Sequence, residues 1–349
     1  MTNKDLTPTI AVYGANGHTA GHLLTELRRR GITPILVGRN AERLREAALA
    51  ADLPDAEIRL ADLDDRAALV AAFTGADVVI SALSAFAVLG APVVEAAIAA
   101  GAHYTDTSGE QLFVKRVLEE YGDRAAATGV TVIPGITDNN LPGDLLGHLT
   151  SRRVPGPAAL VVSHLSRSKG NGSKGSAKTV LASLDWFTSG GYHYEDGELR
   201  TGPLTRFTEV TMPGDTTPTA VSKFPQSPVI TIPRHSDVAY VAGILDSEIL
   251  THLGEFTPEA LESIPDAPSS DLRYHVIVDT VGTDGTQVRG LVSGVDSYRD
   301  SALMAAEVAT RLATGTARPG ALAPAEAFDP VDLLDSFVPH GLTWTIESR

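Results

Sequence analysis

The sequence predicts an α/β protein with a doubly wound parallel sheet, followed by a second α+β domain with a mixed sheet. Two observations support this class. From residue 8 to residue 134, short apolar runs alternate with segments of helical period, and parallel strands require such crossover connections. After residue 150 the runs become longer and more alternating, as in mixed or antiparallel sheets. We therefore expect a first domain over residues 1–150, completed by returning helices over 315–349, and a second domain over 151–314.

Six apolar runs are expected to form the first sheet. They are Thr9–Gly14, Pro34–Gly38, Glu57–Asp62, Asp77–Leu83, His103–Asp106 and Val130–Gly135. The first helix should bury one apolar stripe, made of Ala20, Leu23, Leu24 and Leu27. Gly31 should end this helix, Asn40 should cap the second, and Asp64 or Asp65 should cap the third.

The second domain should begin after a linker at Arg152–Pro157. Its expected strands are Leu160–Leu165, Pro228–Ile232, Leu272–Val281 and Gln287–Val295. A long helix over Tyr298–Thr314 should follow, before a tail marked by proline and glycine.

Composition limits the function classes. The 349 residues are 43% hydrophobic and 20% charged, as in ordinary globular proteins of about two domains. A net charge of −15 would repel nucleic acid. The absence of cysteine excludes disulfides and thiolate metal sites and fits a reducing compartment. Without a signal peptide or an apolar membrane span in the sequence, we expect a cytoplasmic protein that binds no membrane.

The clearest motif is GANGHTAG, which lies between the first strand and the first helix. Gly14 would allow the tight turn, Gly17 would let the backbone approach a pyrophosphate, and Ala20 would allow close packing of helix and strand. In this context the motif predicts dinucleotide binding by a Rossmann domain. The alternative is a purely structural turn.

The residues after the second strand indicate which dinucleotide binds. An NAD site usually has an acidic residue there for the ribose hydroxyls, but this chain has Arg39. A guanidinium group can bind a 2′-phosphate in a bidentate manner, which favours NADP, although a solvated arginine is the alternative. Asp62, after the third strand, would accept a hydrogen bond from the adenine amino group or cap a helix.

Three further segments follow predicted strands, at the edge where open α/β sheets bind ligands. Leu83, Ser84 and Ala85 are expected beside the nicotinamide. Tyr104 or Asp106 would deliver a proton, although turn formation and helix capping explain Asp106 equally well. The third segment, Gly135–Asp144, is polar and also compatible with turns.

A basic loop over Ser166–Lys178 carries four cations and no acid. It would close over an anionic or carrier-bound substrate with Lys174 as an anchor, or it is a solvated loop. No histidine cluster with metal-ligand spacing and no serine hydrolase motif is present in the sequence.

These segments together resemble the saccharopine dehydrogenase-like family of NADP-dependent reductases, which includes trans-acting enoyl reductases. The similar segments include GANGHTAG, VGRNAERL, SALSAFAVLGAPVVEAAIAAGAHYTDTSGE, PGITDNNLPGDL and SGVDSYRDSALMAAEVATRLATG. The resemblance implies hydride transfer to a C=N bond or an activated C=C bond. It implies a cofactor site made of Gly14, Asn16, Gly17, His18, Thr19, Arg39 and Leu83–Ala85, with Tyr104, Asp106 and Glu110 on the nicotinamide side.

Two functions are compatible with these observations. The first is an NADP(H)-dependent reductase acting on a small or carrier-bound substrate in the interdomain cleft. The second is a non-catalytic NADP(H)-binding protein whose redox state alters a partner surface. Fold analogy suggests a homodimer formed through the second sheet.

Overall fold

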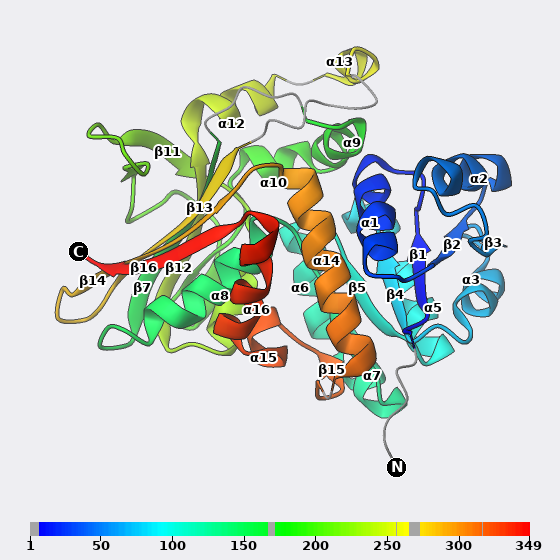
Figure 1. Ribbon diagram of the computed structural model, residues 1–349. Coiled ribbons are helices and arrows are strands. Elements are labelled where there is room, and N and C mark those ends of the chain that lie inside the picture. The colour runs from blue at the N-terminus through cyan, green and yellow to red at the C-terminus, as the bar shows by residue number, and fades with distance from the viewer. Residues whose placement is uncertain (1–6, 167–171, 256, 265–272, 316) are drawn as a thin grey trace.

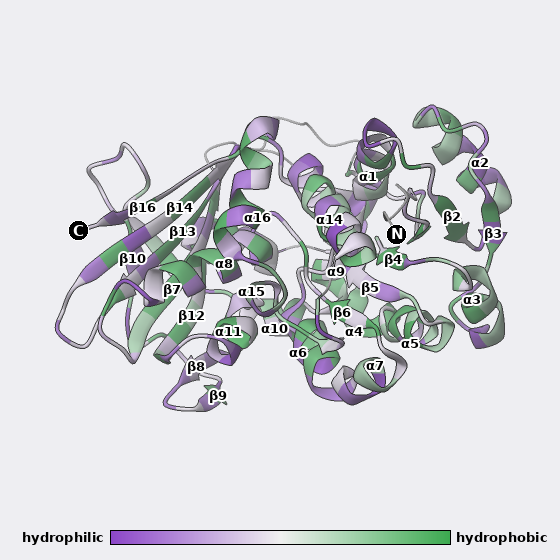
Figure 2. Cartoon of the chain, turned by 60° about the horizontal axis from the view of Figure 1, so that its bottom comes forward, coloured by the Kyte–Doolittle hydropathy of each residue, from purple (hydrophilic) through white to green (hydrophobic). Residues whose placement is uncertain are grey.

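The computed structural model describes residues 7–166, 172–255, 257–264, 273–315 and 317–349. Two sheets lie side by side, with the long helix α14 (Ser297–Thr314) between them (Figure 1). In Figure 2 strands β2 and β4 of the first sheet are green, whereas the outer β8–β9 hairpin is mostly purple. The predicted fold class is therefore confirmed.

The first sheet has seven parallel strands in the order β15-β6-β5-β4-β1-β2-β3. Six are the predicted runs: β1 (Ile10–Tyr13), β2 (Ile35–Gly38), β3 (Ile58–Leu60), β4 (Val78–Ser81), β5 (His103–Asp106) and β6 (Thr131–Ile133). The seventh, β15 (Gly320–Ala321), comes from the far end of the chain and pairs with β6. Because β1 and β4 lie in the middle of the sheet, all of their residues are buried.

Helices cover both faces of this sheet, as crossover connections require. They are α1 (His18–Arg29), α2 (Ala41–Ala50), α3 (Arg66–Phe73), α4 (Phe86–Leu89), α5 (Ala91–Ala100), α6 (Gln111–Glu120) and α7 (Gly122–Thr128). The next helix, α8 (Asn140–Ser151), packs on β7, β13 and β14 of the second sheet. The predicted stripe of α1 is buried, and Gly31 follows this helix with φ +74°. Asn40 and Asp65 cap α2 and α3, each accepting a backbone hydrogen bond within the first turn, so both predicted caps are confirmed.

The second sheet is mixed. Its described strands are β7 (Ala158–Ser166), β8 (His193–Glu195), β9 (Glu198–Arg200), β10 (Glu209–Val210), β11 (Thr219–Lys223), β12 (Val238–Asp246), β13 (Tyr274–Val281), β14 (Gln287–Gly294) and β16 (Thr343–Ser348). Only β7 and β12 pair in parallel; the other described pairings are antiparallel. Three of the predicted runs correspond to β7, β13 and β14, with residue 272 outside the described residues. The described helices of this half are α9 (Lys174–Ala182), α10 (Leu184–Thr188), α12 (Ser247–Gly254) and α13 (Pro258–Glu262).

The strand predicted at Pro228–Ile232 is wrong. This segment forms the short helix α11 (Pro228–Thr231) and continues into the 3₁₀ turn η1 (Ile232–Arg234). Pro228 lacks the N–H group that a central strand donates and begins the helix, and Pro233, directly after the predicted run, lies in η1. The apolar side chains instead pack on glycines of α8: a Cβ at Gly147 would lie 2.4 Å from Ile232. The strand that pairs with β7 in parallel is β12, which was not predicted.

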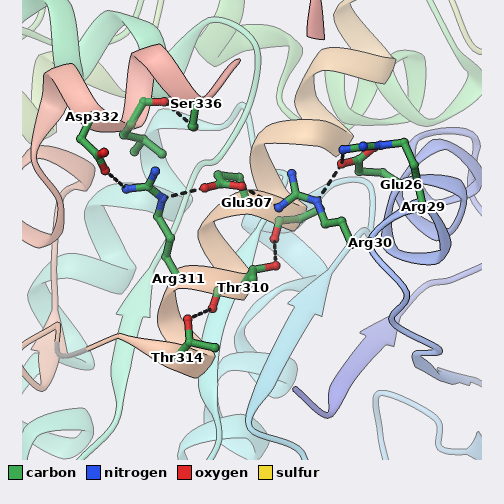
Figure 3. Close-up of polar contacts among 11 residues, drawn as sticks. Glu26, Arg29, Arg30, Glu307, Thr310, Arg311, Thr314, Asp332 and Ser336 are labelled. Carbon is green, nitrogen blue, oxygen red and sulfur yellow. Dashed lines mark hydrogen bonds and ion pairs between the residues drawn. The ribbon is translucent and has the colours of Figure 1, made fainter. Parts of the chain in front are cut away.

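Helix α14 packs on α1 and on strands β4 and β5 of the first sheet, although the sequence grouped it with the second domain. A chain of ion pairs joins α1, α14 and α16 (Pro330–Phe337), as Figure 3 shows. Arg30 lies 2.7 Å from Glu26 and 2.6 Å from Glu307, and Arg311 lies 2.7 Å from Glu307 and also pairs with Asp332. The C-terminal segment, with α15 (Pro324–Ala327), η2 (Val338–His340) and β16, contributes to both sheets. Among the described residues, no helix has the length and apolar character needed to cross a bilayer.

Candidate active site

The turn between β1 and α1 requires glycine. Gly14 has φ +77°, and a Cβ there would lie 3.1 Å from the carbonyl oxygen of Ala82. Its N–H donates to the carbonyl of Val37 at 3.1 Å, which ties the turn to β2. Gly17 is the N-cap of α1 and provides no side chain, and the first turn contains no acidic residue. The N–H groups and the positive end of the helix dipole can therefore bind a phosphate group.

Arg39 and Asp62 lie near each other at the ends of neighbouring strands. Gly38 pairs with Leu60, so both residues emerge at the same edge of the sheet, and both side chains are exposed. Burial and the charge of Asp62 raise the pKa of Tyr13 to about 12, and the charge of Arg39 opposes this shift. Asp65, not Asp62, is the N-cap of α3. The structure thus brings both predicted adenosine-side residues together.

Helix α9 lies over the loop that follows β4. Ala85, with φ +52°, donates its N–H to the hydroxyl of Thr179 at 2.9 Å. Ser173 caps α9 and donates its own N–H to the Tyr298 hydroxyl at 2.6 Å. Lys174 is the first residue of α9, and a Cβ at the next residue, Gly175, would lie 3.9 Å from Cβ of Ser84. Lys169 and residues 167–171 of the predicted basic loop lie outside the described residues.

The phosphate-binding turn also contacts α14. The ring of His18 lies 4.9 Å from that of Tyr298 and 5.0 Å from that of His22, in edge-to-face arrangements. Burial and the neighbouring His22 lower the pKa of His18. A neutral ring at this position can donate one N–H to a phosphate oxygen. Asn16 is exposed and Thr19 is partly exposed.

Tyr104 and Asp106 lie beneath this edge and are both fully buried. Asp106 accepts hydrogen bonds from the backbone N–H groups of Ser108 and Gly135, each at 2.9 Å. Burial raises the pKa of Asp106 to about 6, and burial together with Asp106 raises that of Tyr104 well above its usual value. Glu110 accepts hydrogen bonds from the backbone of Phe86 and Ala87 at the start of α4. In this structure the three side chains support the loops of the site from below.

We expect Asp106→Asn to stabilise the protein increasingly as the pH rises. The folded-state pKa of Asp106 is raised, so the folded state loses stability relative to the unfolded state as the pH rises from about 4 through about 6. Two pKa units correspond to about 3 kcal/mol. Urea unfolding between about pH 4 and pH 7 measures the difference, with the exposed Asp64→Asn as control. A difference between Asp106→Asn and wild type that does not change with pH would contradict this assignment.

A polar pair that the sequence did not predict as a site lies between the two sheets. His164 is on β7, and its Nε2 lies 3.0 Å from Oδ2 of Asp138, in the turn after β6. The signal in the sequence was a single histidine in the apolar run LVVSHLS, on the same strand face as Leu160 and Val162. A polar residue on a buried strand face is unusual, and it is the kind of signal that can indicate a functional position.

The first domain is similar to a known protein family. Residues 10–133 match the family described as Saccharopine dehydrogenase NADP binding domain. Residues 10–133 thus resemble an NADP-binding domain of this family. The predicted resemblance is confirmed, and the predicted cofactor, NADP, agrees with the description of the matched family.

The curated relatives match over the same part of the chain. A trans-acting enoyl reductase of Mycobacterium tuberculosis is 32% identical over 151 residues, which cover 41% of this chain and 35% of the relative. A lipid droplet localized protein of Caenorhabditis elegans is 30% identical over 146 residues, covering 39% of this chain and 34% of the relative. The matches thus span about a third of the length of these relatives.

Two solved structures share the fold of both sheets. Apo saccharopine dehydrogenase (L-Glu forming) from Saccharomyces cerevisiae superposes with a TM-score of 0.64 at 14% identity, covering 98% of this chain and 100% of that chain. An amine dehydrogenase from Mycobacterium smegmatis has a TM-score of 0.53 at 11% identity, covering 93% of this chain and 96% of that chain. At these identities the likeness concerns the fold.

Proposed function

We propose that this protein is an NADP(H)-dependent reductase that transfers a hydride to a C=N bond or an activated C=C bond of a small or carrier-bound substrate. The observation that carries the proposal is the cradle made by the Gly14 turn, the open N-terminus of α1 and Arg39 at one sheet edge. The names of the relatives support the reaction class, since one is a trans-acting enoyl reductase and one solved structure is a saccharopine dehydrogenase.

The residues of the chain would bind, orient and shield the reactants. The bound cofactor supplies the hydride. The N–H groups at the start of α1 would bind the pyrophosphate, and Arg39 would bind the 2′-phosphate. Helix α9, held to Ala85 through Thr179, would cover the nicotinamide side and exclude water. Lys174 at the start of α9 would anchor an anionic substrate.

Arg39→Ala should weaken NADPH binding by about 10- to 100-fold, because a charge-assisted pair with the 2′-phosphate contributes roughly 1.5–3 kcal/mol. NADH lacks this phosphate, so its dissociation constant should change little. Fluorescence titrations of both cofactors measure the effect, with Arg45→Ala, also exposed on α2, as the matched control. Equal losses for NADPH and NADH would exclude the 2′-phosphate role.

The second candidate is a non-catalytic NADP(H)-binding sensor. One observation favours it: both proton donors expected from the sequence, Tyr104 and Asp106, have no exposed surface. The two functions differ in whether the protein oxidises NADPH in the presence of a substrate. NADPH oxidation with a cyclic imine or an enoyl thioester supports the reductase, whereas tight NADPH binding without oxidation across both classes supports the sensor.

A further inference from the structure

His164, on β7, and Asp138, in the turn after β6, make a close contact through their side chains. Nε2 of His164 and Oδ2 of Asp138 are 3.0 Å apart, and both atoms are buried. The 3.0 Å separation is that of an ion pair, and neither atom has a hydrogen bond among the residues that the structure describes. Yet the pair is open to solvent, because 25% of the His164 side chain and 11% of the Asp138 side chain are exposed. The open part of the histidine is thus away from its contact with the carboxylate.

Two neighbours hold the pair in place. The Asp138 N–H donates to the hydroxyl of Ser301 at 2.9 Å, and this hydroxyl donates back to Oδ1 of Asp138 at 3.2 Å. Oδ1 is therefore occupied, which leaves Oδ2 for the histidine. The ring of Tyr274 lies 5.5 Å from the imidazole, and its hydroxyl donates to Asp300 at 3.2 Å. The imidazole is thus positioned by a carboxylate and an aromatic ring.

The pair lies at the same sheet edge as the cofactor cradle. Ser301, which holds Asp138, is three residues after Tyr298 on α14, so both side chains share one helix face. Tyr298 contacts His18 of the phosphate-binding turn and Ser173 of α9. On the other side, Asn140 donates to the carbonyl of Ser108, after β5, at 3.2 Å. Residues beside the pair in space and in sequence, Tyr298 and Asn140, therefore contact the phosphate-binding turn and the loop after β5.

We propose that His164 is the proton donor of the reduction and that Asp138 is its positioning residue. This inference rests on the proposed function. The carboxylate of Asp138, 3.0 Å from Nε2, would favour a proton on that nitrogen, so Nδ1 would be the nitrogen that faces the substrate. Hydride from NADPH adds to one atom of the C=N or C=C bond, and the other atom takes the Nδ1 proton as the π pair becomes a bond to hydrogen. The products are the saturated compound, NADP⁺ and a neutral imidazole, which water reprotonates.

The kinetic test uses NADPH oxidation with 2-methyl-1-pyrroline and crotonyl-CoA as probes. His164→Asn should lower kcat by about 100-fold or more with an unchanged NADPH dissociation constant. Added imidazole should restore part of the activity, which a purely structural role would not allow. Asp138→Asn should change the pH profile of kcat, and His275→Asn on the opposite face of the sheet is the control. A kcat for His164→Asn within threefold of wild type would overturn the proposal.

A second measurement does not depend on turnover. Diethyl pyrocarbonate should modify Nδ1 of His164 in the apo protein, and saturating NADP⁺ should slow this modification by about fivefold or more, as mapped by mass spectrometry. If the protein binds NADPH but His164 is modified equally with and without NADP⁺, the proton-donor role is excluded while the cofactor site stands. If titration shows no NADPH binding, the proposed function itself fails, and this inference with it.

Discussion

Gly14→Val is expected to abolish measurable NADPH binding, whereas Gly21→Ala should leave it unchanged. The two glycines belong to the same motif but differ in their surroundings. Gly14 has φ +77°, which a β-branched residue such as valine rarely adopts. A Cβ there would also lie 3.1 Å from the carbonyl oxygen of Ala82, and this backbone group cannot move away without moving the turn. Gly21 is exposed on α1, and a Cβ there meets no atom within 4 Å.

The measurement combines an NADPH fluorescence titration with thermal unfolding. Gly21→Ala should raise the unfolding free energy by about 0.5–1 kcal/mol, because alanine is the better helix former. Gly14→Val should lose the cofactor even if most of the fold survives. If Gly14→Val binds NADPH as tightly as wild type does, the phosphate-binding turn has been placed incorrectly.

Asp144→Ala should destabilise the protein by about 3–5 kcal/mol, the usual result of leaving one partner of a buried ion pair uncompensated. Oδ1 of Asp144 lies 2.8 Å from Nε2 of His235, and Oδ2 accepts the N–H of Ala325 at 2.9 Å. Both side chains are almost completely buried. The pair joins α8, η1 and α15, so its loss should loosen the junction between the two sheets. Urea unfolding measures the change, and a loss below about 1 kcal/mol would contradict the assignment.

The Asp144–His235 pair should contribute most to the free energy of unfolding within a limited pH range. Despite its burial, His235 has a raised pKa because of the charge of Asp144 and its hydrogen bond, with Glu326 adding to and Arg234 opposing the shift. The pKa of Asp144 is lowered by the charge and hydrogen bond of His235, against its burial. The histidine contribution is complete below the unfolded value of 6.5 and declines as the pH rises through the folded value.

The carboxylate contribution is complete above the unfolded value of 3.8 and declines as the pH falls through the folded value. The pair therefore contributes fully between about pH 4 and pH 6.5. Burial, the charge of His235 and that of Arg152 lower the pKa of His148, whose Nδ1 lies 3.2 Å from Nδ1 of His235. A neutral His148 can accept a hydrogen bond from the Nδ1–H of a charged His235. Asp144→Asn should remove this pH dependence of stability, and an unchanged profile would contradict it.

Much of the first domain could be predicted from the sequence because its determinants are local. The caps Asn40 and Asp65 act within one turn of their own helices, and the Gly14 turn lies between a strand and a helix that follow each other directly. The second sheet depends on distant segments. Strand β12 pairs with β7 across more than 70 residues, and β15 joins the first sheet only after strands β7 to β14 of the second sheet. No local pattern specifies such partners.

The candidate site also combines features that the sequence could predict with features that depend on distant segments. The sequence could place Tyr104 and Asp106 near a strand end, but their burial depends on helices and turns that pack over them. Asp138 and His164 are 26 positions apart and meet because α8 carries the chain from one sheet to the other. Their contact also requires Ser301, from α14. Tertiary packing alone brings these three residues together.

The central claim is that the edge from Gly14 to Arg39 binds NADP(H). Titration of the purified protein with NADPH and with NADH, followed by nicotinamide fluorescence at one fixed ionic strength, tests it most directly. The account predicts saturable NADPH binding that is at least about tenfold tighter than NADH binding, as expected for one charge-assisted contact to the 2′-phosphate. Binding of neither cofactor, or tighter binding of NADH, would contradict it.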